Sequence, residues 1–376
     1  MKILLVTDLY PIGKENITKA LYDFVMEWHR QGHEVEVIRP NFKFNTKIRG
    51  RKIIKEKIYN ENGIKIYNLN FTTPFWFNVR RKLPKNFSLN NYDVMLSHMP
   101  SGALMAQKLL EKEKIKYVCA VHASDITVLK NFKYALYFKQ KLKQAYLTSD
   151  KIAARSPVLQ QKIEQIIPEV QDKTFVAYSG INKNFITDKK ERSFNYENLQ
   201  ICTASSLIKR KNIDIIIESL SKLNEKFKYT IIGSGKYLRN LKKLSAKLGI
   251  KSKILFLGHL EHNEVMKKLK EHDIFILLSD NETFGLVYLE AMAAGNIVIA
   301  KKNDGIDGII QDGKNGFLIN ADNAELVKCI QKIYNLKETE INKIRANAVE
   351  TVQKMTIEAA AKSYLDNLKI KRYLIY

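Results

Sequence analysis

Two glutamates, Glu282 and Glu290, belong to the segment Asp280–Gly295, which reads DNETFGLVYLEAMAAG and follows a strand-like apolar run. Thr283–Gly285 has the composition of a turn, and Leu286–Ala294 is rich in residues that favour helices. A helix that begins just beyond a parallel strand directs unpaired N–H groups and a partial positive charge at the ligand crevice. The segment therefore predicts a site for an anionic ligand such as a diphosphate, with the two carboxylates at different depths.

The order of these features resembles glycosyltransferase family 4, whose signature is usually written E-[GS]-F-G-x4-E-A-M-A-x-G. Only Thr283 departs from that signature. Further segments resemble the family in order along the chain: AVHASD at 120–125, YSGI at 178–181, YTIIGSG at 229–235, ILFLGHL at 254–260 and the glycine-rich residues 305–318. The resemblance covers most of the chain and implies a GT-B fold, retaining chemistry and a nucleotide-sugar donor.

Roles for the two glutamates follow from this resemblance. Glu282 would hydrogen-bond hydroxyl groups of the donor sugar and position the donor, without acting as a nucleophile. Glu290 would hold the ribose, because a carboxylate accepts two hydrogen bonds from adjacent hydroxyls. Main-chain N–H groups would meet the sugar and the diphosphate at Phe284, Gly285, Leu286 and Val287.

Cationic partners for the diphosphate are expected in the segment Ser205–Asn212. The family places an arginine and a lysine there, five residues apart, and this chain has Lys211 at the lysine position but Ser206 at the arginine position. Serine cannot neutralise a phosphate. Arg210 or Lys209 could compensate, although adjacent residues on a strand or loop usually point elsewhere.

Other site residues rest on weaker matches. His122 ends a predicted strand, and the family uses such a histidine near the transferred sugar; a satisfied structural histidine is the alternative. Gly13, in YPIGK, matches the family's phosphate-approaching loop only in part and could simply shape a turn. Gly233 lies in the strand-end G-x-G, and Leu260 follows the strand end expected near the nucleobase.

The chemistry requires stabilisation of negative charge on the departing nucleoside diphosphate. Lys211 and the helix N-terminus are the means that the sequence offers. The chain has no D-x-D motif, so we expect no cofactor and no metal, the nucleotide-sugar being a substrate. Domain closure is expected to exclude water and limit donor hydrolysis.

Strand-like and helix-like segments alternate along the chain, which predicts parallel sheets with helices on both faces. The predicted fold class is α/β of the GT-B type, with two doubly wound Rossmann-like domains facing a central cleft. We expect an N-terminal acceptor-side domain at 1–186, a linker at 187–198, a C-terminal nucleotide-sugar-binding domain at 199–355, and a helix at 356–376 that packs back on the first domain.

Charge and composition bear on partners and location. The net charge is +24, and residues 42–85 contain twelve Lys or Arg but only two acids. Such a stretch attracts an anionic membrane surface or nucleic acid, or reflects a well-solvated lysine-rich surface. The predicted helix Thr127–Tyr146 combines apolar residues with lysines, as an interfacial helix or an ordinary packed helix would. We expect a cytoplasmic protein, peripheral on the inner face of the cell membrane, that binds no nucleic acid.

Three scattered cysteines, Cys119, Cys202 and Cys329, support neither a disulfide framework nor a zinc site and fit a reducing compartment. The predicted function is transfer of a hexose-type sugar, preferably from a UDP-sugar, to a saccharide or lipid-linked saccharide in cell-surface glycan synthesis. The alternatives are a nucleotide-sugar epimerase or phosphorylase of the same fold, and a catalytically silent polyanion-binding protein.

Overall fold

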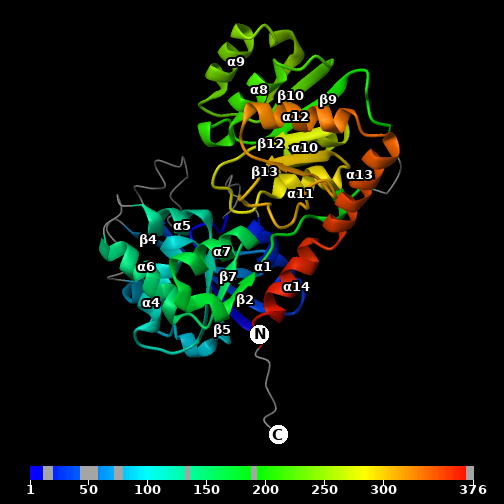
Figure 1. The fold of residues 1–376 in the computed structure, drawn as a ribbon. Coiled ribbons are helices and arrows are strands. Elements are labelled where there is room, and N and C mark those ends of the chain that lie inside the picture. The colour runs from blue at the N-terminus through cyan, green and yellow to red at the C-terminus, as the bar shows by residue number, and fades with distance from the viewer. Residues whose placement is uncertain (12–19, 43–57, 72–78, 132–135, 188–192, 370–376) are drawn as a thin grey trace. The chain divides into compact units, whose positions relative to one another are not determined.

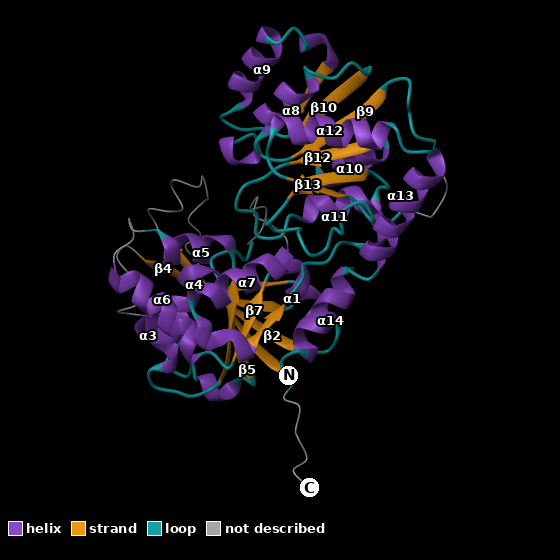
Figure 2. Cartoon of the chain, viewed as in Figure 1, coloured by secondary structure: helices purple, strands orange, loops and turns teal. Residues whose placement is uncertain are grey.

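The computed structural model describes residues 1–11, 20–42, 58–71, 79–131, 136–187 and 193–369. The chain divides into two compact units, the first formed by Met1–Tyr178 with Ile357–Tyr376 and the second by Ser179–Thr356. Each unit has its own sheet, and helices flank each sheet (Figures 1 and 2). The α/β class predicted from the sequence is thus confirmed.

The sheet of the first unit has the strand order β3-β4-β2-β1-β5-β6-β7-β8. Neighbouring strands are parallel except β3 and β4, which form an antiparallel pair. The strands are β1 (Lys2–Val6), β2 (Glu34–Phe42), β3 (Ile58–Glu61), β4 (Ile64–Phe71), β5 (Val94–Ser97), β6 (Lys116–Val121), β7 (Lys151–Ala154) and β8 (Thr174–Val176).

Both faces of this sheet are buried. In β1, Leu4 and Val6 belong to one hydrophobic cluster, whereas Ile3 and Leu5 belong to another. Successive strand residues point to opposite faces, so helices must cover both. The helices of this unit are α1 (Ala20–Arg30), α3 (Val79–Lys82), η2 (Leu89–Asn91), α4 (Met99–Leu110), α5 (Ala123–Lys130), α6 (Leu136–Thr148), α7 (Pro157–Ile166), η3 (Pro168–Lys173) and α14 (Ile357–Asp366).

Helix α14 brings the end of the described chain onto α1 of the first unit. The Trp28 indole Nε1 donates to the Ala361 main-chain oxygen at 3.0 Å, and its ring lies edge-on to Tyr364 at 5.4 Å. Both aromatic residues are buried. This contact is therefore part of the first unit's core.

The second unit has an all-parallel six-stranded sheet of order β11-β10-β9-β12-β13-β14. Its strands are β9 (Leu199–Ala204), β10 (Phe227–Ile232), β11 (Ile254–Gly258), β12 (Ile274–Leu277), β13 (Ile297–Lys301) and β14 (Phe317–Ile319). Its helices are η4 (Lys183–Phe185), η5 (Lys209–Lys211), α8 (Ile213–Leu220), α9 (Leu238–Lys247), η6 (Lys251–Lys253), α10 (His262–Lys270), α11 (Leu286–Ala293), α12 (Asn323–Tyr334) and α13 (Glu338–Gln353).

The structure corrects the predicted domain boundary. Residues 179–186 belong to the second unit, not to the first. The Ile181 N–H donates to the Met355 main-chain oxygen at 3.0 Å, and the Thr187 N–H donates to that of Ala293 at 2.9 Å. These two backbone bonds attach both ends of the segment 181–187 to the second unit.

The structure also corrects the single helix predicted at Thr127–Tyr146. Helix α5 ends at Lys130, and α6 begins at Leu136. The Asn131 N–H caps α5 by donating to the Thr127 main-chain oxygen, and Asn131 itself has extended backbone angles. In the part of the chain that the structure describes, no helix is both long and apolar enough to cross a bilayer.

Candidate active site

The second unit has a topological switch point between β9 and β12. The chain runs from β9 outward through β10 and β11, then returns to place β12 on the other side of β9. Ligands of open parallel sheets bind beyond the carboxyl ends of the strands at such a point. The loops that follow β9 and β12 contain Lys211 and Glu282 respectively, so the fold brings together residues that lie far apart in sequence.

Glu282 lies between two cations. Its carboxylate forms an ion pair with the Lys211 ammonium, and its Oε2 atom lies 3.5 Å from Nη1 of Arg210. Lys211 is buried, whereas the Arg210 side chain is 43% exposed. The main-chain N–H of Glu282 donates to Asp304 Oδ1 at 2.7 Å, which fixes the loop that carries the carboxylate.

Adjacent residues Arg210 and Lys211 therefore both reach Glu282, contrary to the expectation that neighbours point apart. The reason is that residues 209–211 form the 3-10 turn η5, in which side chains do not alternate as they do in a strand. Lys209 instead pairs with Asp214. Ser206 is exposed, and among the described residues it makes no hydrogen bond to Glu282.

Asp280 joins the two loops beneath the ion pair. Its carboxylate pairs with Lys301 and accepts a hydrogen bond from Asn212 Nδ2 at 3.0 Å, while its main-chain N–H donates to the Arg210 oxygen at 2.7 Å. Burial would raise the pKa of Asp280, but the bonds from Lys301 and Asn212 hold it below its ordinary value. Asp280 is thus an anion that orders the cationic loop.

Helix α11 begins directly beyond Glu282. Gly285 is its N-cap and has a positive φ of 85°, a backbone conformation that would be strained in a residue with a side chain. Phe284 is buried, whereas Leu286 and Val287 at the start of the helix are half-buried. The first N–H groups of the helix lack intrahelical partners, so this end presents donors and a partial positive charge near Glu282.

Glu290 lies within α11, and its Oε1 atom is 2.8 Å from Nε2 of His262, the first residue of α10. The His262 ring packs edge-on against Phe185 at 4.9 Å. Sequence reasoning did not identify His262. Its position as the first residue of a helix just beyond β11 could have identified it as a candidate site residue.

Gly233 follows β10 with a φ of 131°, and a Cβ atom there would collide with the Ser205 main-chain oxygen. The loops after β9 and β10 can therefore approach each other only because residue 233 is glycine. Leu260 follows β11 and is half-buried. Gly13 lies outside the described residues, as do residues 43–57 and 72–78 of the basic stretch 42–85.

In the first unit, the carboxyl ends of β5 and β6 carry two histidines. His98 Nδ1 lies 3.1 Å from His122 Nε2. Burial, together with the charge of the nearby Arg155, lowers the pKa of His122 to about 3 and lowers that of His98 well below its usual value. The sequence identified His122 but not His98, although a polar residue directly after a buried parallel strand is a recognisable signal.

Polar and strained groups surround the two imidazoles. The Asp125 carboxylate accepts from the His122 main-chain N–H at 3.1 Å and from the Tyr146 hydroxyl at 2.8 Å. Burial raises the pKa of Asp125 to about 7. Met99, directly after His98, has a φ of 70°, a left-handed conformation that is costly for a residue with a side chain.

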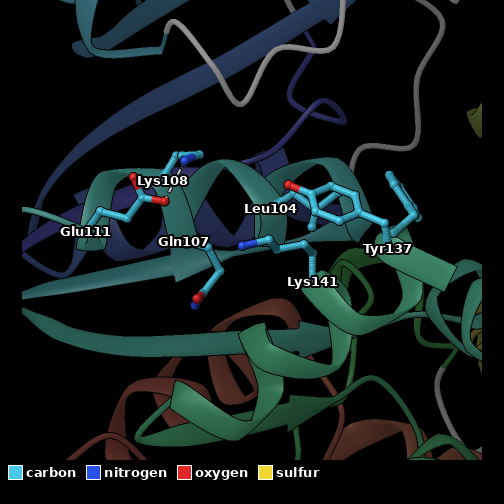
Figure 3. Close-up of a pocket in the computed structure, with 7 residues that line it drawn as sticks. Leu104, Gln107, Lys108, Glu111, Tyr137 and Lys141 are labelled. Carbon is cyan, nitrogen blue, oxygen red and sulfur yellow. Dashed lines mark hydrogen bonds and ion pairs between the residues drawn. The ribbon is translucent and has the colours of Figure 1, made fainter. Parts of the chain in front are cut away.

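A shallow pocket lies elsewhere in this unit, between α4 and α6 (Figure 3). It is lined by Leu104, Gln107, Lys108, Glu111, Tyr137, Phe138 and Lys141. Lys108 pairs with Glu111 at 2.6 Å at its rim. These residues lie on helices and not at strand ends. Within the described ranges, no group of acidic, histidine or cysteine residues is arranged to hold a metal ion.

Comparisons with known proteins find two family models that match the chain. Residues 184–354 match the family model described as glycosyl transferases group 1, and residues 17–185 match that of glycosyltransferase family 4. An uncharacterized glycosyltransferase of Methanocaldococcus jannaschii is 28% identical, over 69% of this chain and 70% of its own length. The N-acetyl-alpha-D-glucosaminyl L-malate synthase of Bacillus anthracis is 26% identical, over 83% of this chain and 82% of its own.

Among solved structures, Anabaena HepE in complex with UDP is similar across 98% of this chain and 99% of its own, with a TM-score of 0.75 and 18% identity. The same protein has also been solved with UDP-glucose. The likeness shows a shared GT-B fold, as the sequence predicts.

Proposed function

The chain belongs to the GT-B glycosyltransferases of the group 1 and family 4 type, and we propose that it transfers a hexose-type sugar from a UDP-sugar with retention of configuration. The observation that carries this proposal is the convergence of Lys211 and Arg210 on Glu282 at the start of α11. The UDP and UDP-glucose complexes of the similarly folded HepE support the choice of donor.

The departing nucleoside diphosphate gains negative charge as the bond to the sugar breaks. Lys211, Arg210 and the N–H groups at the start of α11 stabilise this charge, which grows only as the reaction proceeds. In the structure Glu282 pairs with both cations. The diphosphate replaces Glu282 at Lys211, and the released carboxylate then accepts hydrogen bonds from the sugar hydroxyls.

Other residues bind the rest of the donor in this proposal. Glu290 holds the ribose hydroxyls, and His262 orients its carboxylate. Gly233 allows the close approach of the loops around the diphosphate, and Leu260 packs near the base. His122 contacts the transferred sugar, the role that family resemblance implies.

The reaction as proposed uses no metal, because two side-chain cations and a helix end provide the positive charge. Transfer rates are therefore expected to be unchanged by a chelator such as EDTA. A rate that falls on chelation and recovers with Mg²⁺ or Mn²⁺ would contradict this part of the proposal.

We propose a saccharide or lipid-linked saccharide as acceptor, presented at an anionic membrane surface on its cytoplasmic side. At the start of α6, Leu136 is 70% exposed and Tyr137 is 51% exposed. Apolar side chains at that position, with Lys141 on the same helix, suit an interface with lipid headgroups. Co-sedimentation with anionic vesicles at low and high salt tests this, and equal recovery with neutral vesicles would contradict it.

The central experiment is a binding and transfer screen over UDP-, GDP- and ADP-linked sugars. Glu290→Ala is expected to lose donor binding, whereas Glu350→Ala, on the exposed face of α13, is the matched control and should bind normally. Release of UDP only in the presence of an acceptor supports transfer. Conversion of the sugar without an acceptor would indicate an epimerase, a requirement for orthophosphate a phosphorylase, and binding without turnover a silent protein.

A further inference from the structure

The two histidines of the first unit form a chain of polar contacts that ends on α14. His98 Nδ1 lies 3.1 Å from His122 Nε2, and His98 Nε2 lies 3.4 Å from the Tyr364 hydroxyl. Tyr364 and His98 are almost completely buried, whereas His122 is 8% exposed. Of these three side chains, His122 therefore lies nearest to solvent.

The Tyr364 hydroxyl is held in a fixed position. The rings of Phe24, Trp28 and Phe175 pack around the Tyr364 ring at centroid distances of 6.0, 5.4 and 5.7 Å. Burial raises the pKa of Tyr364, so the phenol stays protonated. Among the described residues, His98 Nε2 is the single hydrogen-bond partner of this hydroxyl.

The donor and the acceptor in each of these hydrogen bonds follow from counting protons. If His98 donated through Nε2, the buried Tyr364 O–H would have no acceptor, and a buried donor without a partner is costly. The hydroxyl therefore donates to His98 Nε2. A neutral imidazole carries one N–H, so His98 then donates through Nδ1 to His122 Nε2.

The same count leaves the proton of His122 on Nδ1. The Asp125 N–H donates to the main-chain oxygen of His122 at 3.0 Å, and the His122 side chain makes no cap hydrogen bond to α5. An unpartnered N–H on His122, which is 8% exposed, costs less than one at Tyr364, which is 1% exposed, because water or a ligand can accept from it.

We propose that Tyr364 and His98 are positioning residues that fix His122 as the Nδ1–H tautomer, so that His122 donates a hydrogen bond to an oxygen of the bound sugar and does not act as a base. This inference rests on the proposed function, because it assumes that a sugar lies against His122. Burial and the positive charge of Arg155 keep both imidazoles neutral, which the chain of donors requires.

The tautomer can be measured without any substrate. The chain has seven histidines, so 15N-histidine labelling with long-range 15N–1H correlation, assigned with His122→Gln, resolves the two ring nitrogens of His122. The wild-type protein at neutral pH is expected to show His122 protonated on Nδ1 and bare on Nε2. A His122 protonated on Nε2, or on both nitrogens, overturns the inference.

Variants separate positioning from simple stability. His98→Leu removes the donor to His122 and should shift His122 to the Nε2–H form, whereas His98→Asn retains a donor and should preserve Nδ1–H. Tyr364→Phe should give a mixture of the two forms. Tyr22→Phe on α1 removes a hydroxyl that is outside the chain of contacts and is the matched control. Unchanged tautomers in both His98→Leu and Tyr364→Phe would overturn the inference.

Enzyme kinetics test whether the tautomer of His122 affects the rate of sugar transfer. His98→Leu is expected to lower kcat/KM by about tenfold, the worth of one hydrogen bond, and His98→Asn should recover most of that loss. Wild-type protein that has the expected tautomer but transfers no sugar would remove the proposed function alone. Active wild-type protein with His122 in the Nε2–H form would remove this inference alone.

Discussion

The carboxyl edges of the two sheets hold opposite kinds of chemistry at equivalent places in the topology. In the second unit the edge is charged, with Lys211, Arg210 and Glu282 in mutual contact. In the first unit the middle of the edge holds two neutral imidazoles, because His98 and His122 are bonded to each other and buried, with the charge of Arg155 nearby. Charges suit the anionic part of a nucleotide-sugar, and neutral donors suit an uncharged sugar.

The difference has a physical basis in desolvation. A buried charge is expensive unless it is paired, so the cations of the second unit are accompanied by Glu282 and Asp280. A neutral imidazole avoids this cost and can be buried completely, provided that its nitrogens find partners. The second edge therefore keeps paired charges that a ligand can separate, whereas the first keeps a fixed arrangement of donors.

Removing the buried cation should have the largest effect on the charged edge. Lys211→Met is expected to lower kcat/KM by about 100-fold to 1,000-fold, the range for losing one group that stabilises transition-state charge. Lys209→Met is the matched control, because that ammonium pairs with Asp214. Steady-state transfer and calorimetric titration of UDP measure the effect. Equal losses in the two variants would show that general charge, not the site, was responsible.

Close packing of the loops at the charged edge can be tested by stability. Gly233→Ala should lower the free energy of unfolding by more than about 2 kcal/mol, because the new Cβ meets the Ser205 oxygen in addition to the strain of a positive φ. Gly249→Ala, with a φ of 71° and open space around it, should cost only about 1 kcal/mol. Denaturant unfolding of both variants compares them, and equal losses would mean that the loops can separate freely.

The exposed cation of the same edge should matter less than the buried one. Arg210→Ala is expected to lower kcat/KM by about tenfold, because solvent partly screens this side chain. Adding Ser206→Arg should restore activity if a cation at residue 206 can serve the same diphosphate. A double variant no better than Arg210→Ala would show that Arg210 has a different role.

The buried histidine pair of the first unit should make the free energy of unfolding depend on pH. The folded-state pKa values of His98 and His122 are lowered, so between about pH 4.5 and 6 the unfolded chain binds two more protons at these residues. Asp125, with a pKa raised to about 7, binds one more in the folded state. The net difference of one proton makes stability fall by about 1.4 kcal/mol per pH unit as the pH decreases.

His122→Gln removes one of the protons that the unfolded protein binds. The slope of the free energy of unfolding against pH should therefore be smaller in this variant. Denaturant unfolding of wild type and variant at several pH values gives the difference between the two slopes. The test compares slopes because other groups titrate equally in both proteins. An identical pH dependence in the two proteins would show that His122 is protonated when folded, which would contradict the neutral character of this edge.

Local patterns explain what could be predicted. Glu282, Gly285 and Glu290 are contiguous with one strand, one turn and one helix, so their relation follows from the sequence of the segment. Alternation of strand-like and helix-like segments likewise predicted two sheets that are largely parallel. The predicted helix at Thr127–Tyr146 was wrong because apolar periodicity continues across the break after Lys130.

The sequence by itself determined the fold class, and it predicted an anion site at the start of α11 with Lys211 as a cation for it, because these depend on short-range order and residue type. Only the tertiary structure decided that Arg210 turns toward Glu282 and that Tyr364 meets His98 across 266 residues of chain. Such contacts depend on backbone turns and on the docking of α14, and neither leaves a signal in the spacing of residues.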